Sequence, residues 1–154
     1  MLSKFILIVL LLACVTPQSH AQQDSSLFAR LARSVTDQRS EWAIAKKRIV
    51  PKADIAYYEW KSRKSSVAAM IFIKDSSDAA TACLEGFSDL FGETKLTDKL
   101  ANLGDENYVW KRPYPKGTIG VDFRKGKIAV HIVAGNISDA NFFAEMIAAE
   151  LDAT

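Results

Sequence analysis

Residues 118–133 do more than any other segment to narrow the folds open to this chain. Apolar and polar residues alternate over 118–124, so one side of a β-strand there is apolar and the other polar. Lys125 and Gly126 follow as a tight turn, because glycine readily adopts the positive φ that such turns need. Residues 127–133 are again rich in β-branched side chains. The segment therefore predicts an antiparallel hairpin with a buried face and a polar face.

The rest of the chain repeats the same kinds of pattern. Strands are expected at 42–50, 53–62, 67–73 and 107–112, and amphipathic helices at 24–35, 76–91 and from Ser138 to near the C-terminus. Grouped strands with helices between them favour an α+β fold. We expect an antiparallel sheet of about five to six strands, arranged as a hairpin followed by a three-strand meander. The helices are expected to pack mainly on one face.

The first residues have the pattern of an export signal. Lys4 precedes an apolar run over 5–13 that is too short to span a membrane, and small residues at Ser19 and Ala21 suit a signal peptidase. This predicts a signal peptide over 1–21, cleaved after Ala21, and a single domain over 22–154. Residues 11–14 also resemble a lipobox, in which Cys14 would be lipidated and would hold the protein at a membrane. The protein is thus expected to be exported, either periplasmic or secreted, or else a membrane-anchored lipoprotein.

Composition excludes several classes of protein. The 20 basic and 18 acidic residues nearly balance, whereas nucleic-acid binders usually carry a clear basic excess. No apolar stretch after the signal is long enough to span a membrane. Without Cys14, Cys83 has no cysteine to pair with, and its helical apolar surroundings are typical of a small core residue. We expect no nucleic-acid partner, no cofactor and no metal.

Several pieces of the second half resemble small exported bacterial α+β domains of unassigned function, of the lipoprotein or envelope type. They are the Gly104-Asp105-Glu106 turn, the hairpin turn over 123–126 and the closing amphipathic helix. Each piece is ordinary turn and capping chemistry. The resemblance implies the layout of the fold and no activity.

One polar constellation emerges when strand alternation is applied to the whole chain. If the polar sides of the strands lie away from the helices, an exposed sheet face gathers six side chains. As a functional site, this face is a shallow binding surface or a source of two acids, Glu59 and Asp122, for glycoside cleavage. As a structural feature, it is the solvated side of a sheet held by cross-strand ion pairs. The six residues are Tyr57, Glu59, Lys61, Asp122, Arg124 and His131.

Two further residues bear on function. His131 has no cysteine or histidine near it in the sequence, so it does not indicate a metal site. Tyr114, between two prolines, is the best candidate for an exposed aromatic residue in an interaction loop.

Three functions remain open at this point. The first is an exported, non-catalytic binding or accessory module for a protein, peptide or small ligand. The second is a small secreted hydrolase that uses Glu59 and Asp122. The third is an envelope accessory protein anchored through Cys14.

Overall fold

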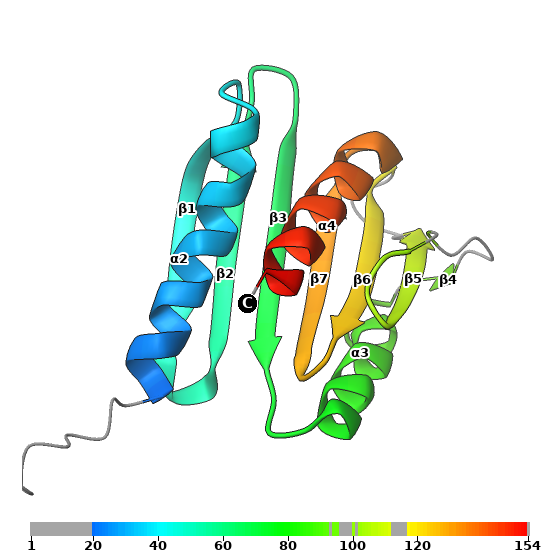
Figure 1. Cartoon of the computed structure of the whole chain (residues 1–154). Helices are drawn as coiled ribbons and strands as arrows, with labels where there is room; N and C mark the ends of the chain where they lie inside the picture. Colours follow the sequence, from blue (N-terminus) through cyan, green and yellow to red (C-terminus); the bar gives the residue numbers. More distant parts are fainter. Residues whose placement is uncertain (1–19, 93, 96–99, 101, 112–116, 154) are drawn as a thin grey trace, which may run out of the picture.

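The computed structural model describes residues 20–92, 94–95, 100, 102–111 and 117–153. Within them, seven strands form one antiparallel sheet in the order β1-β2-β3-β7-β6-β5-β4 (Figure 1). The elements in chain order are α2 (His20–Gln38), β1 (Ala43–Val50), a 3-10 turn (Pro51–Ala53), β2 (Ile55–Lys61), β3 (Ser66–Ile73), α3 (Ser77–Phe91), β4 (Thr94–Lys95), β5 (Glu106–Lys111), β6 (Ile119–Lys125), β7 (Ile128–Ala134) and α4 (Ile137–Asp152).

Two meanders of neighbouring strands build the sheet. One contains β1, β2 and β3, and the other contains β5, β6 and β7, with the two-residue β4 at its outer edge. They join in the middle of the sheet, where β3 pairs antiparallel with β7. The α+β class and the antiparallel sheet are confirmed, and the Lys125–Gly126 turn joins β6 to β7, with Gly126 at a φ of 55°.

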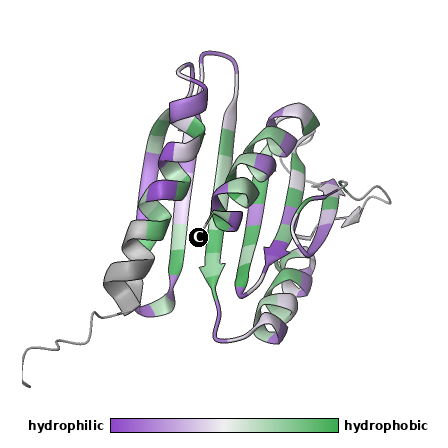
Figure 2. Ribbon diagram, viewed as in Figure 1, coloured by the Kyte–Doolittle hydropathy of each residue, from purple (hydrophilic) through white to green (hydrophobic). Residues whose placement is uncertain are grey.

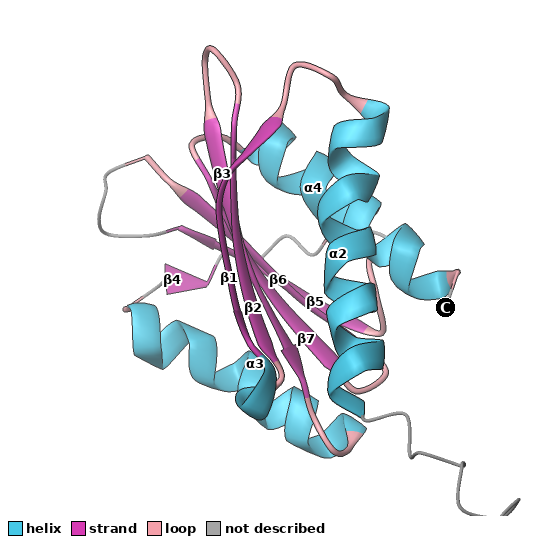
Figure 3. Ribbon diagram, turned by 90° about the vertical axis from the view of Figure 1, so that its left-hand side faces the viewer, coloured by secondary structure: helices cyan, strands magenta, loops and turns pink. Residues whose placement is uncertain are grey.

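The helices form layers on both sides of the sheet (Figure 3). Helices α2 and α4 pack together on one side, which we call the two-helix face; Tyr58, Ala69 and Ile132 point to it. Helix α3 lies against β7 and β6 on the other side, which we call the α3 face. The helices therefore lie mainly on one face, with α3 as the exception.

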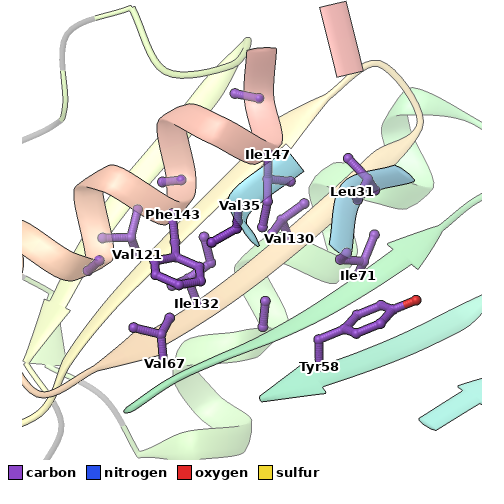
Figure 4. Packing of buried hydrophobic residues seen from close by; sticks show 14 of the residues in the cluster. Leu31, Val35, Tyr58, Val67, Ile71, Val121, Val130, Ile132, Phe143 and Ile147 are labelled. Carbon is purple, nitrogen blue, oxygen red and sulfur yellow. The ribbon is translucent and has the colours of Figure 1, made fainter. Parts of the chain in front are cut away.

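The main core fills the space between the sheet and the two-helix layer (Figure 4). Leu31 and Val35 of α2 and Phe143 and Ile147 of α4 are fully buried, because apolar residues recur there at helical spacing. Trp60 packs edge-on against Phe143. Its indole nitrogen donates a hydrogen bond to a backbone carbonyl of α2, 3.3 Å away. This core fixes the position of β2, which carries part of the candidate site.

A smaller core lies under α3. Leu84 and Phe87 are buried against Phe72 of β3 and Ala129 of β7. Ser76 caps the first turn by accepting a hydrogen bond from the backbone nitrogen of Ala79. The apolar side of α3 packs against the sheet. The middle of β1, far from α3, is hydrophilic (Figure 2). Helix α3 thus covers part of its face and leaves the part around β1 and β2 open.

Several sequence predictions fall outside the described residues. Residues 1–19, which contain Cys14 and most of the predicted signal peptide, and the loop residue Tyr114 are among them. Among the helices that the structure does describe, none has the length and apolar character that crossing a membrane requires.

Candidate functional site

The six polar residues predicted to share a sheet face do share one. Strand register places Tyr57, His131 and Asp122 in one row across the α3 face, with Met70 between Tyr57 and His131. Glu59 belongs to the next row, opposite Ala68 of β3. Alternation along the strands was therefore enough to assign these side chains to one face. It was not enough to predict their surroundings, which fall into three separate places.

Asp122 and His131 are buried, so the expectation that they lie on a solvated face is wrong. Their side chains are 0% and 1% exposed, and Asp122 Oδ1 lies 2.6 Å from His131 Nδ1. The ring of Phe91 stacks on the imidazole at 4.4 Å between centroids, and Phe87 packs beside it. The cause is α3, which covers β7 and β6 on this face.

Arg124 lies at the far end of the α3 face and holds a turn together. Its guanidinium donates to Asp105 Oδ2 at 2.9 Å and to the carbonyl of Gly126 at 3.0 Å. The same carboxylate oxygen accepts a hydrogen bond from the Gly126 backbone nitrogen at 2.8 Å. The Gly104-Asp105-Glu106 turn and the β6–β7 turn, which are distant in sequence, thus close on each other through Arg124. This arrangement assigns Arg124 a structural role.

Tyr57, Glu59 and Lys61 form the open part of the face, on β2. Glu59 accepts from Lys46 of β1 at 3.1 Å and from Lys61 at 3.2 Å. Hydrogen bonding to Lys46, followed by Lys61, lowers the pKa of Glu59 below its usual range. The Tyr57 hydroxyl donates to Glu59 at 3.4 Å, and burial together with that carboxylate raises the pKa of Tyr57. Glu59 is therefore a charged carboxylate shared by three donors.

Two neighbouring hollows lie over this open part. The larger, about 600 Å³, extends from Glu59 and Lys61 to Lys64 in the β2–β3 hairpin; we call it the hairpin hollow. The smaller, about 190 Å³, lies beside the C-terminal end of α3; we call it the Phe91 hollow. Ala68 and Val133 line both, so the two hollows adjoin each other. The Phe91 hollow is lined by Tyr57, Ala68, Ala69, Met70, Phe91, His131 and Val133.

The two hollows differ in chemistry. The walls of the Phe91 hollow are mostly apolar or aromatic, and its polar side chains are those of Tyr57 and the buried His131. The charged residues that line the hairpin hollow are Lys61, Lys64 and Glu59. Together they form an amphipathic groove with a positive end. A third hollow of about 850 Å³ lies at the end of the sheet, near Trp42 and Asp139, and contains none of the six predicted residues.

The arrangement does not favour hydrolysis by Glu59 and Asp122. Three strand spacings separate β2 from β6, or about 14 Å across the sheet, which exceeds the separation of paired glycosidase carboxylates. Asp122 is also buried against His131. Cys83 is half-buried on α3, and burial raises its thiol pKa, which disfavours the nucleophilic thiolate. Within the described ranges, no three acidic, cysteine or histidine residues are grouped closely enough to hold a metal.

Sequence reasoning missed Lys46, which pairs with Glu59 beside the groove, and the groove residues Met70 and Phe91. Lys46 belongs to a basic run that seemed only to interrupt a strand, yet it pairs directly with Glu59 across β1 and β2. Met70 and Phe91 have apolar side chains, and the sequence pattern predicts both as core residues. The sequence did contain one indication of this packing: residues 67–73 are apolar on both sides of the strand. Such a pattern indicates that other elements cover both faces of that strand.

Comparison with known proteins gives no relative. The sequence matches no family model, and no curated protein or solved structure is significantly similar to it.

Proposed function

We propose that this chain is an exported binding module that holds an amphipathic, anionic ligand in the groove formed by the hairpin hollow and the Phe91 hollow. The observation that carries the proposal is that the two hollows adjoin at Ala68 and Val133, which places an apolar recess beside a positive rim. Ligand sites in proteins combine such apolar walls with a few placed polar groups. The ligand's apolar part contacts Met70 and Phe91.

The charge of the rim supports an anionic ligand. Lys46 and Lys61 both pair with Glu59, so this trio carries one net positive charge. Lys64 adds another cation at the border of the hairpin hollow. An anionic head group gains attraction there, while a cationic one is repelled. Export is part of the proposal because of the signal-like pattern over residues 1–21.

Decanoate is a suitable probe because it joins a short apolar chain to a carboxylate. We expect saturable binding of decanoate by isothermal titration calorimetry, and weaker binding of both acetate and decyltrimethylammonium. Chemical-shift changes should concentrate on β2, β3 and the end of α3. The proposal would be overturned if decyltrimethylammonium bound as tightly as decanoate, or if the chemical-shift changes centred on the hollow near Trp42.

A matched pair of variants tests the position of the site. Ala68→Phe fills the junction between the two hollows and should weaken decanoate binding at least tenfold. Ala149→Phe makes the same change at an exposed position of α4, away from the groove, and should leave binding unchanged. Retained affinity in Ala68→Phe, with its circular dichroism spectrum intact, argues against the groove.

A further inference from the structure

The outer edge of β1 has no pairing strand in the part of the chain that the structure describes. β1 is the last strand of the sheet on its side, and within the described residues it pairs with β2 alone. All eight of its residues are exposed except Ile49, which is half-buried. Such an edge presents unpaired backbone donors and acceptors to any extended segment that reaches it. The opposite edge differs, because β4 contains two residues.

The regular part of this edge follows a bulge. The β1–β2 register shifts between Ile44 and Lys46, and from Lys46 to Val50 the pairing is continuous. Apolar side chains remain exposed at both ends of the strand, with Ile44 at 41% and Val50 at 38% exposure. A second strand laid along β1 would cover these side chains and complete the backbone hydrogen bonding.

Charge decides which segment fits the edge. Lys46, Lys47 and Arg48 are consecutive, so cations project from both faces of β1. Lys46 pairs with Glu59, whereas Lys47 and Arg48 form no ion pair within the described part of the chain. A second copy of this chain, paired antiparallel along the same edge, would place cations opposite cations, which destabilises cross-strand pairing. An acidic strand would place carboxylates there instead.

We propose that β1 binds an extended acidic segment of a partner protein by strand addition. The segment forms backbone hydrogen bonds with the outer edge over Lys46–Val50. Its carboxylates face Lys47 and Arg48, and its apolar residues cover Ile44 and Val50. Lys47 and Arg48 line neither of the two hollows, so either proposal can fail without the other.

The test uses the whole chain and a synthetic peptide, acetylated and amidated, of sequence Val-Glu-Glu-Glu-Val-Thr-Val. A second peptide has lysine at each glutamate, and a third has proline at the central glutamate, which prevents strand pairing. We expect the acidic peptide alone to bind in isothermal titration calorimetry, with affinity that falls as salt rises. Hydrogen exchange of the outward amides of β1 should slow on binding.

Charge reversal separates this edge from general electrostatic attraction. Lys47→Glu/Arg48→Glu should weaken acidic-peptide binding about tenfold or more, while decanoate binding stays unchanged. Lys111→Glu/Lys127→Glu makes the same change in net charge at exposed positions away from β1 and should bind the peptide almost as the parent does.

Several results would overturn the proposal. One is that the acidic and lysine peptides bind equally well, and another is that the control variant loses as much peptide affinity as the charge-reversed variant. The others are slowed amide hydrogen exchange outside β1 and no saturable binding of the acidic peptide up to about 1 mM. Self-association of the chain through β1 in sedimentation velocity would also contradict it. The peptide comparison on the unmodified chain stands even where a variant does not fold.

Discussion

His131 and Asp122 lie directly opposite each other on β7 and β6, and their side chains meet at 2.6 Å in the buried layer beneath α3. The contact joins two strands of one meander on the side of the sheet away from its main core. Its burial makes it sensitive to the loss of either partner, because a buried polar group that loses its hydrogen bond is costly.

Replacing one partner of this pair should therefore destabilise the fold. His131→Phe keeps an aromatic ring under Phe91 but removes the nitrogen that Asp122 contacts. We expect the free energy of unfolding to fall by about 3 kcal/mol in urea titrations. The double variant His131→Phe/Asp122→Leu, apolar at both positions, should recover most of that loss. Additive losses in the double variant would show that the pair is not energetically coupled.

Glu59 should contribute stability at neutral pH and lose it in acid. Lys46 and Lys61 lower its pKa in the folded protein. Because the pKa of Glu59 is lower in the folded protein, the ion pairs stabilise the fold at pH values above the unfolded-state pKa, near 4.5. This stabilisation disappears as the pH falls through the folded-state pKa. Glu59→Gln should thus be less stable than the parent at pH 7 and equally stable below the folded pKa, as measured by urea unfolding from pH 7 to pH 2.

Salt and a second glutamate provide the controls for Glu59. Both lysines are largely exposed, at 67% and 56% of their side chains, so 1 M salt should shrink the difference at neutral pH. Glu145→Gln, on the exposed side of α4, should show no comparable pH-dependent loss. A difference that persists unchanged in acid would contradict the ion-pair origin.

Tyr108 should ionise at unusually high pH. Its hydroxyl donates to Glu106, and this hydrogen bond, with burial second, raises its pKa to about 12. The stability from the neutral phenol is complete below the unfolded pKa near 10 and is lost as the pH rises through about 12. In absorbance titrations of tyrosinate, Glu106→Gln should move one ionisation towards 10, and Tyr108→Phe should remove it. An unchanged titration in Glu106→Gln would refute the assignment.

Gly104 should tolerate no side chain. Its φ is 62°, and a Cβ built there would lie 2.4 Å from the backbone oxygen of Arg124. Gly126 has a similar φ of 55° but open space around it. Gly126→Ala should cost about 1–2 kcal/mol from backbone strain alone, and Gly104→Ala clearly more. Thermal unfolding of both variants tests this. Equal losses of stability in the two variants would show that the close approach to the Arg124 backbone oxygen is not the cause.

Local pattern was enough to predict most of the secondary structure. Alternation over 118–124 assigned Asp122 and Arg124 to the same side of a strand, and that assignment holds in the sheet. The short strand expected at 42–50 is β1, despite its basic run. These predictions succeed because they depend on neighbours within one strand or turn.

Contacts between distant segments could not be predicted in this way. The position of α3 above β7 and β6 depends on packing between elements, so the burial of Asp122 and His131 was missed. The bond between Arg124 and Asp105 likewise needs two turns to meet in space. The groove was only partly found, because Met70 and Phe91 look like core residues until their neighbours are known.

The pairing of β3 with β7 makes the sheet a union of two halves that can each begin to form alone. Within each meander, strands pair with their neighbours in sequence, whereas Val67 of β3 meets Ala134 of β7. Closing such a distant contact carries a large entropic cost, so this central joint should set the rate of folding. It is also where the two halves should first separate when the molecule is strained.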